Sequence, residues 1–191
     1  MPTIRILRPS DDRSSFQCGD ADLDRFFAKY AGQNQFRHHI GTSYVAVDDP
    51  SGRVLGYATI SVASIEIDAV PAALKKKLPT YPMPVLRLAR LAVDRSAQGK
   101  GIGSALLQYV LHIALRVAND FGCLGVVVDA KPDAVAFYEA YGFAPLDVVE
   151  GQSDARPKPT AMFLSVREIQ AAVDGRPGRP TAVSRPRGGG P

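Results

Sequence analysis

The stretch that decides the fold reads Arg87-Leu-Ala-Arg-Leu-Ala-Val-Asp-Arg-Ser-Ala-Gln-Gly-Lys-Gly-Ile-Gly-Ser104. It begins as an apolar strand with Leu88, Leu91 and Val93, passes through a polar turn with three glycines at alternate positions, and continues as an amphipathic helix to about Asn119. Glycine lets the backbone adopt positive φ and approach a ligand closely, and the first N–H groups of a helix lack intrahelical partners. The stretch therefore predicts an anion site that favours a phosphate.

The elements expected outward from this stretch alternate between strands and helices. The expected strands are Thr3–Arg8, Thr42–Val47, Val54–Val62, Val126–Asp129, Phe143–Val149 and Ala161–Val166. The expected helices are one beginning near Asp20, with Leu23, Phe26, Phe27 and Tyr30 on one face, and others over Gln33–Arg37, Ala72–Leu78, Pro132–Glu139 and Arg167–Val173. Four prolines make residues 69–84 mostly loop. This order predicts an α/β fold with a mixed sheet.

Composition indicates one domain, and it restricts the classes of site. Residues 1–173 are expected to form the domain, and the Gly-, Pro- and Arg-rich residues 174–191 are expected to be disordered. Four arginines against one aspartate give that tail a charge of +3 out of the total of +4, so the domain is nearly neutral. No apolar run approaches the length of a membrane span and no signal peptide is visible, which predicts a cytoplasmic protein. Neither the cysteines nor the histidines have metal-site spacing, so no metal is expected.

The spacing of the glycines excludes two common phosphate loops. A P-loop needs four residues between its first glycine and a Gly-Lys pair, and this stretch cannot be aligned to that pattern. The dinucleotide fingerprint Gly-x-Gly-x-x-Gly needs its third glycine one residue later than Gly103. A nucleoside triphosphate and a dinucleotide are therefore both disfavoured.

What the residues do fit is Gln/Arg-x-x-Gly-x-Gly/Ala, as Gln98-Gly-Lys-Gly-Ile-Gly103, with Leu91-Ala-Val93 upstream and Phe137-Tyr-Glu-Ala-Tyr-Gly-Phe143 downstream. With these three segments the chain resembles the GNAT superfamily of N-acetyltransferases. The resemblance implies a mixed central sheet of about six to seven strands with splayed middle strands, flanked by about four helices. It also implies acetyl-CoA as co-substrate and no metal.

The resemblance also implies roles for residues of the cofactor site. The residues expected to bind acetyl-CoA are Leu91, Ala92, Val93, Gln98, Gly99, Lys100, Gly101, Ile102, Gly103 and Ser104. Backbone N–H groups of the glycine loop would hold the pyrophosphate, and the main chain of Leu91 and Val93 would pair with the pantetheine arm. Acyl transfer expels a thiolate, and Tyr138 is the expected acid. Without the resemblance, a tyrosine packed in the core is the simpler interpretation. Lys131 stands where many members have Asn, so a side-chain contact to the arm is in doubt.

The N-terminal half narrows the resemblance to the GNAT toxins of bacterial toxin–antitoxin modules. The segments that carry it are Phe16-Gln-Cys-Gly19, Leu23-Asp-Arg-Phe26, Ala31-Gly-Gln-Asn-Gln35, Gly56-Tyr-Ala-Thr-Ile-Ser61 and Leu78-Pro-Thr-Tyr-Pro82. Such toxins acetylate the α-amine of aminoacyl-tRNA and block translation, and their usual partner is a ribbon-helix-helix antitoxin. A homodimer is left open. The alternatives are a GNAT enzyme acting on a protein N-terminus, a lysine or a small amine, and a non-catalytic CoA-binding or nucleic-acid-binding module.

Basic residues near the predicted site are compatible with a tRNA substrate. Residues 75–100 hold seven basic residues and one acidic residue. The expected tRNA contacts are Asn34, Arg37, Arg87 and Arg90. For each arginine, a solvated or ion-paired position on the surface explains its presence equally well. An α-amine is partly neutral near pH 7, so a strong general base is not essential and no carboxylate is nominated for that role. Glu66 is the one acid worth testing.

Overall fold

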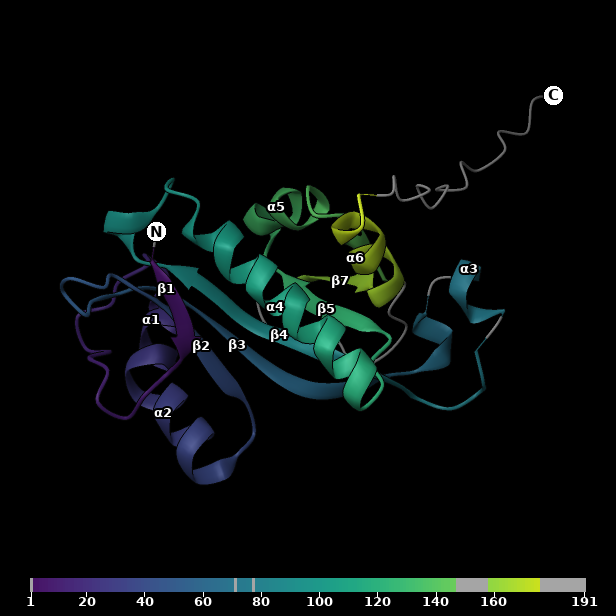
Figure 1. The fold of residues 1–191 in the computed structure, drawn as a ribbon, viewed down its shortest axis with the longest axis horizontal. Coiled ribbons are helices and arrows are strands. Elements are labelled where there is room, and N and C mark those ends of the chain that lie inside the picture. The colour runs from purple at the N-terminus through teal and green to yellow at the C-terminus, as the bar shows by residue number, and fades with distance from the viewer. Residues whose placement is uncertain (1, 71, 77, 147–157, 176–191) are drawn as a thin grey trace.

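A computed structural model describes residues 2–70, 72–76, 78–146 and 158–175 of the chain. Seven strands form one mixed sheet in the order β1-β2-β3-β4-β5-β7-β6 (Figure 1). The strands are β1 Thr3–Ile6, β2 Thr42–Val47, β3 Val54–Ile65, β4 Met83–Val93, β5 Gly125–Ala130, β6 Ala144–Pro145 and β7 Thr160–Ser165. All neighbours are antiparallel except β4 and β5, which are parallel. The sheet confirms the α/β fold class and the expected number of strands.

The helices are short apart from one. They are α1 Ala21–Arg25, α2 Ala31–Gln33, α3 Ala72–Lys75, α4 Ile102–Asp120, α5 Val135–Glu139 and α6 Val166–Val173. Two π-helical turns continue these short helices: η1 Phe26–Tyr30 lies between α1 and α2, and η2 Asn34–His38 follows α2. Together the four turns form one continuous helical stretch, which we call the α1–α2 segment. Three 3₁₀ turns complete the set, η3 Ile67–Ala69, η4 Arg95–Ala97 and η5 Pro132–Ala134.

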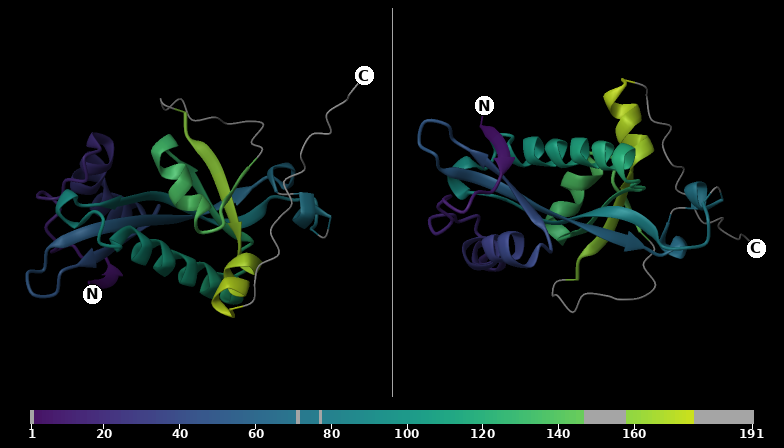
Figure 2. Two further views of the ribbon diagram at one scale, coloured as in Figure 1. Left: turned by 90° about the horizontal axis from the view of Figure 1, so that it is seen from above. Right: turned by 60° about the horizontal axis from the view of Figure 1, so that its bottom comes forward.

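The sheet separates two apolar cores. On one face, α4 buries Ile102, Leu106 and Val110 against strand residues such as Leu86 and Leu88, and α5 and α6 add to this core. On the other face, the segment from α1 to η2 buries aromatic rings against Tyr57 of β3. Figures 1 and 2 show α4 and the α1–α2 segment on opposite sides of the strands. Alternation of side chains along β2 and β3 supplies both cores from the same strands.

Two local irregularities open the middle of the sheet. Pairing between β4 and β5 covers only the steps from Leu86–Val126 to Leu88–Val128, and beyond these steps the two strands separate. In β4, Leu88 pairs with Ile60 and Arg90 with Thr59, so Ala89 is an extra residue that forms a β-bulge. A bulge bends the strand and reverses the alternation of its side chains. This bend accounts for the expected splay of the central strands.

Several expected elements differ from the structure in their bounds. Strand β4 starts at Met83 rather than near Leu88, so Pro84 lies inside the strand. Pro84 has no N–H to donate, but its carbonyl accepts from the N–H of Leu124, so the strand tolerates proline at this position near its start. Tyr30 leaves the apolar face of its helix and is 46% exposed, because the wider π turn rotates it outward. The expected end of the strand Phe143–Val149 and the expected disorder of residues 176–191 lie outside the described residues. Within the described residues, no helix has the length and apolar character needed to cross a membrane.

Candidate active site

A cleft of about 270 Å³ lies where β4 and β5 separate. One wall is the segment Leu88–Val93 of β4, and the other is Val128–Ala130 of β5 with Lys131 after it. Tyr138 of α5 lines the cleft, as do Leu23 of α1 and Gln98. The cleft therefore brings together three parts of the chain that the sequence singled out: the apolar strand, the glycine loop and the segment that contains Tyr138.

The β4 wall exposes backbone hydrogen-bonding groups to the cleft. In an antiparallel ladder, residues alternate between those bonded to the partner strand and those pointing away from it. Asp94 donates its N–H to the carbonyl of Leu55 at 2.9 Å, so the ladder with β3 uses the backbone of Asp94, Ala92 and Arg90. The N–H and C=O groups of Leu91 and Val93 therefore point toward β5. These are the two residues expected to pair with a pantetheine arm.

The glycine loop ends at an open helix N-terminus. Gly99 and Gly101 have φ values of 72° and 77°, and no atom lies within 4 Å of a Cβ placed on either residue. Gly101 is the N-cap of α4 and supplies no side-chain oxygen. The first intrahelical bond runs from the N–H of Ala105 to the carbonyl of Gly101, which leaves the N–H groups of Ile102, Gly103 and Ser104 available. Such a nineteen-residue helix presents the positive end of its dipole to an anion.

Two side chains of the same loop stabilise the protein itself. The Gln98 side-chain amide donates to the carbonyl of Cys18 at 2.9 Å and to the carbonyl of Val93 at 3.0 Å. The Lys100 ammonium folds back onto the carbonyl of Ser96 at 2.9 Å. In this structure the loop therefore offers its backbone to a ligand, while these two side chains hold the loop and the segment around Cys18 in place.

Tyr138 combines burial with access to the cleft. Only 5% of the residue is exposed, and its ring packs edge-on against Phe137 and Phe143. Burial raises the pKa of Tyr138 well above its ordinary value, because the phenolate loses its hydration. The hydroxyl therefore stays protonated at neutral pH. Tyr138 thus both packs in the core and lines the cleft, and its role as the acid stays a prediction.

The bulge at Ala89 places Arg90 on the face opposite α4. The Arg90 guanidinium lies 3.7 Å from the centroid of the Phe26 ring, a cation–π contact, and Arg90 lines the cleft. Arg87 is half-exposed and forms an ion pair at 3.2 Å with Asp129, which also lines the cleft. Of the expected tRNA contacts, Arg90 therefore lies in the cleft, and Arg87 is linked to its edge through Asp129.

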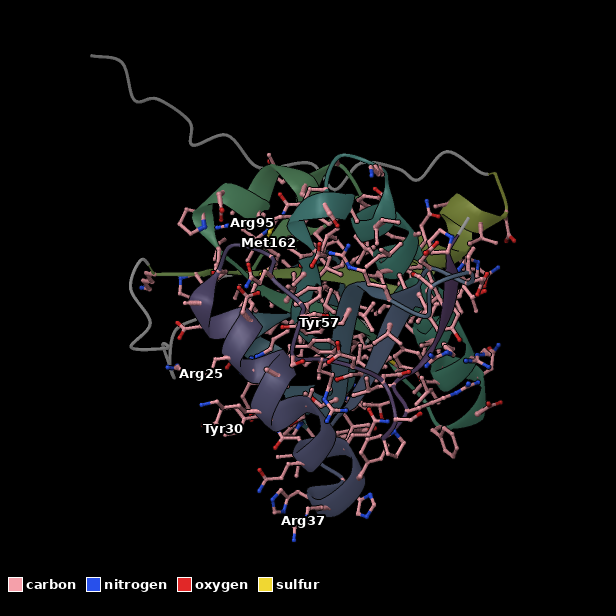
Figure 3. All side chains as sticks on the ribbon, turned by 90° about the vertical axis from the view of Figure 1, so that its left-hand side faces the viewer. Arg25, Tyr30, Arg37, Tyr57, Arg95 and Met162 are labelled. Carbon is pink, nitrogen blue, oxygen red and sulfur yellow. The ribbon has the colours of Figure 1, made fainter. Side chains whose placement is uncertain are left out.

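The other two expected tRNA contacts lie away from the cleft. Asn34 and Arg37 belong to η2, at the far end of the α1–α2 segment. Figure 3 shows Arg25, Tyr30 and Arg37 along the outer side of this segment, while Tyr57 lies inside the molecule. Asn34 and Arg37 therefore do not line the cleft, and their contact with tRNA stays a prediction.

Among the residues that line the cleft but were not in the expected site set, five are ionisable: Cys18, Asp20, Asp129, Lys131 and Asp133. Burial raises the pKa of the Cys18 thiol to about 11, so it is protonated and a poor nucleophile at neutral pH. Asp129 is the polar end of an otherwise apolar strand, which is a weak signal available in the sequence. Asp20 and Lys131 meet only in the folded chain. The described residues contain no group of three His, Cys, Asp or Glu side chains able to hold a metal ion.

Comparison with known proteins identifies relatives of this chain. A sequence model of the acetyltransferase (GNAT) domain matches residues 39–145. A tRNA-acetylating toxin of Mycobacterium tuberculosis is 34% identical over 158 residues, which cover 80% of this chain and 93% of that protein.

Solved structures agree with these sequence relatives. AtaT complexed with acetyl-methionyl-tRNAfMet superposes with a TM-score of 0.78 at 30% identity, covering 90% of this chain and 98% of that chain. A Tyr-to-Phe variant of the AtaT toxin, bound to the C-terminus of the antitoxin AtaR and acetyl-CoA, has a TM-score of 0.71 at 27% identity, covering 90% of this chain and 97% of that chain.

Proposed function

The chain belongs to the GNAT acetyltransferase family, and we propose that it is a toxin that acetylates the α-amine of aminoacyl-tRNA with acetyl-CoA and so blocks translation. The observation that carries the proposal is the cleft itself. It contains backbone groups of β4 that point toward β5, a protonated tyrosine, and Gln98 at the start of the loop that leads to the open N-terminus of α4. Its charged side chains are Arg90 and Lys131 together with Asp20, Asp129 and Asp133. The similarity to a tRNA-acetylating toxin and to a tRNA-bound AtaT supports the choice of acceptor.

The residues present fit acetyl-CoA at the separated strands. Backbone N–H groups of residues 99–104 would hold its pyrophosphate, because no side chain caps α4 and both Gly99 and Gly101 have positive φ. The N–H groups of Leu91 and Val93 and the carbonyl of Leu91, which point toward β5, would bind the pantetheine arm as an added strand. The carbonyl of Val93 accepts from the Gln98 amide. Acetyl-CoA supplies an acetyl group that is activated as a thioester.

The reaction joins the amine nitrogen to the acetyl carbon and breaks the bond between that carbon and sulfur. A backbone N–H of Leu91 or Val93 would stabilise the negative charge that develops on the carbonyl oxygen. Tyr138, which is protonated at neutral pH, would give its proton to the departing sulfur and would regain a proton from solvent. The amine loses its proton to solvent, since an α-amine is already partly neutral near pH 7.

The acceptor would lie on the face of the sheet that carries the α1–α2 segment. Arg90, with its guanidinium over Phe26, is a cation that lines the cleft on this face. Arg37 and Asn34 lie farther out on η2, where the acceptor stem of a tRNA would pass. A polyanion gains affinity from such cations mainly through phosphate contacts.

We extend the proposal to the partner and the compartment. AtaT has been solved with the C-terminus of the antitoxin AtaR, which supports an antitoxin for this chain. We expect it to be a ribbon-helix-helix protein encoded next to the toxin. Charged tRNA is consumed by ribosomes, so the proposed activity belongs in the cytoplasm. Sedimentation equilibrium of the purified protein measures whether it is a homodimer.

Incubation of total charged tRNA with labelled acetyl-CoA tests the proposal. We expect label on aminoacyl-tRNA, released by mild base as N-acetylated amino acid, and no label on the same tRNA after deacylation. Sequencing of the labelled tRNA identifies the amino acid and tRNA preferred. Label on protein N-termini, lysines or small amines, with charged tRNA unchanged, would instead establish the alternative acceptor.

A further inference from the structure

One ion pair crosses the open end of the cleft. Lys131, which follows β5, donates from its ammonium to a carboxylate oxygen of Asp20, which precedes α1, and both residues line the cleft. They lie 111 residues apart in the sequence. Pairing between β4 and β5 ends at Leu88–Val128, so the ion pair connects the two sides at the other end of the gap.

Asp20 is fixed to the β4 side of this gap. The segment before it is held by three hydrogen bonds: Gln17 N–H to the Asp94 carboxylate at 3.1 Å, Arg95 N–H to the Gln17 carbonyl at 2.9 Å, and the Gln98 amide to the Cys18 carbonyl at 2.9 Å. The Tyr57 hydroxyl donates to the carbonyl of Leu23 and ties α1 to β3.

Lys131 is fixed to the β5 side. It follows Ala130, which pairs with Thr160 of β7, and its own carbonyl accepts from the N–H of Ala134. The pair therefore joins the two walls at the end of the gap that is farther from the strand pairing and from the Arg87–Asp129 ion pair. The Asp20 carboxylate stays ionised at neutral pH: burial by itself raises its pKa, but the Lys131 hydrogen bond and the N–H groups of Leu23 and Asp22 hold the pKa below its usual value.

The location of the pair indicates which ligand it affects. Strand pairing closes one end of the gap, the ion pair closes the other, and the backbone groups of Leu91 and Val93 that point toward β5 lie between them. An extended arm bound to those groups would be enclosed on the face that carries α1, opposite α4. The phosphates at the α4 N-terminus would lie outside the enclosure.

We infer that Asp20 and Lys131 form a clasp that retains the pantetheine arm of acetyl-CoA in the cleft. The inference rests on acetyl-CoA as donor, as the proposed function does, but not on tRNA as acceptor. The clasp must open or flex for the arm to enter and leave, so breaking it speeds release of the arm. Lys131 thus contributes to binding of acetyl-CoA through Asp20.

Two substitutions break the clasp without removing other contacts. Asp20 is also the N-cap of α1, with its carboxylate accepting from the N–H groups of Asp22 and Leu23. Asp20→Asn keeps that cap, since Asn caps helices as well as Asp does. Lys131→Met keeps the length of the side chain. Lys75→Met is the matched control, because it breaks an ion pair with Asp68 that is not part of the cleft.

The test measures release of acetyl-CoA labelled on its nucleotide, chased with unlabelled acetyl-CoA in a stopped-flow instrument. Both side chains of the pair are partly exposed, 48% and 31%, so we expect each variant to raise the dissociation rate roughly two- to five-fold. The double variant should release no faster than the single ones, and high salt should bring wild type close to them. Labelled 3′-phospho-ADP, which lacks the arm, should leave all proteins at the same rate.

Three results would overturn the clasp. One is an unchanged dissociation rate in both variants, with or without a lower melting temperature, since that would make the pair merely structural. Another is a dissociation rate of acetyl-CoA that rises in one variant and falls in the other, or a dissociation rate of 3′-phospho-ADP that changes as much as that of acetyl-CoA. Either result would indicate that Lys131 acts on the phosphates rather than on the arm. The third is failure of wild type to bind acetyl-CoA, which would also remove the proposed function. If the variants release acetyl-CoA faster as expected but wild type does not acetylate charged tRNA, only the proposed acceptor would be refuted.

Discussion

The two faces of the cleft are built from different chemical groups. On the α4 face, the groups available to a ligand are main-chain N–H groups at Gly99–Ser104 and on β4, while the side chains of Gln98 and Lys100 bind the protein's own carbonyls. On the α1 face, charged side chains from separate segments line the cleft, among them Arg90, Asp129 and Asp20. Each of these contacts another side chain of the protein, namely Phe26, Arg87 and Lys131. One face is made by local backbone conformation and the other by tertiary packing.

This difference matches the two substrates of the proposed reaction. A cofactor shared by a whole family is recognised by groups that every sequence possesses, provided that glycines permit the conformation. The acceptor distinguishes one member from another, and side chains supply that distinction. Substitutions on the α4 face should therefore change acetyl-CoA binding or chemistry, and substitution of Arg90 on the α1 face should change use of the acceptor. The Asp20–Lys131 clasp is the exception on the α1 face, since it acts on acetyl-CoA.

Tyr138→Phe should have the largest effect, because it removes the proposed acid where the two faces meet. We expect acetylation of charged tRNA to fall roughly 10²- to 10⁴-fold. Affinity for acetyl-CoA, measured by calorimetry, should stay close to wild type, since the ring still packs against Phe137 and Phe143. Full transferase activity in this variant would exclude Tyr138 as the acid.

Gly101→Ala tests whether the α4 face depends on backbone conformation. An alanine at φ 77° costs about 1–2 kcal/mol, and the loop can relieve this strain only by turning its N–H groups away. We expect affinity for acetyl-CoA to fall about tenfold. Gly52→Ala is the control, because Gly52 has φ 69° and equally open surroundings but lies in the turn between β2 and β3. Equal losses of affinity in the two variants would contradict the interpretation.

Arg90→Met tests the α1 face. The variant keeps an aliphatic chain over Phe26 but loses the charge, so we expect the KM for charged tRNA to rise roughly three- to ten-fold. Affinity for acetyl-CoA should not change. Arg116→Met, an exposed residue of α4, should leave both quantities unchanged. A loss of acetyl-CoA affinity in Arg90→Met, with the KM for tRNA unchanged, would reverse the assignment of the two faces.

Glu66→Gln should have the smallest effect. Glu66 is exposed, follows the end of β3 and does not line the cleft. We expect the rate of acetylation across pH 6–9 to stay within about twofold of wild type, whereas removal of a general base would cost roughly 10²–10⁴. A loss of that size would show that the cleft closes around Glu66 when substrates bind.

The sequence by itself predicted the cofactor side. Three glycines at alternate positions after an apolar strand define an anion-binding helix N-terminus through local conformation alone, and the segment around Tyr138 could be recognised from its own residues. The fold class followed from the order of strands and helices, and the structure confirms it. The roles of the individual cofactor residues and of Tyr138 stay predictions that the substitutions above test.

Only the tertiary structure decided the acceptor side. With regular alternation Leu88 and Arg90 would lie on the same face of β4, and the bulge at Ala89 sends Arg90 to the opposite face, onto Phe26. A bulge depends on pairing with another strand, which no local pattern specifies. Asp20 and Lys131 likewise meet only because distant segments pack at the two sides of one gap. Local conformation is encoded in neighbouring residues, whereas contacts between separate side chains exist only once the whole sheet has formed.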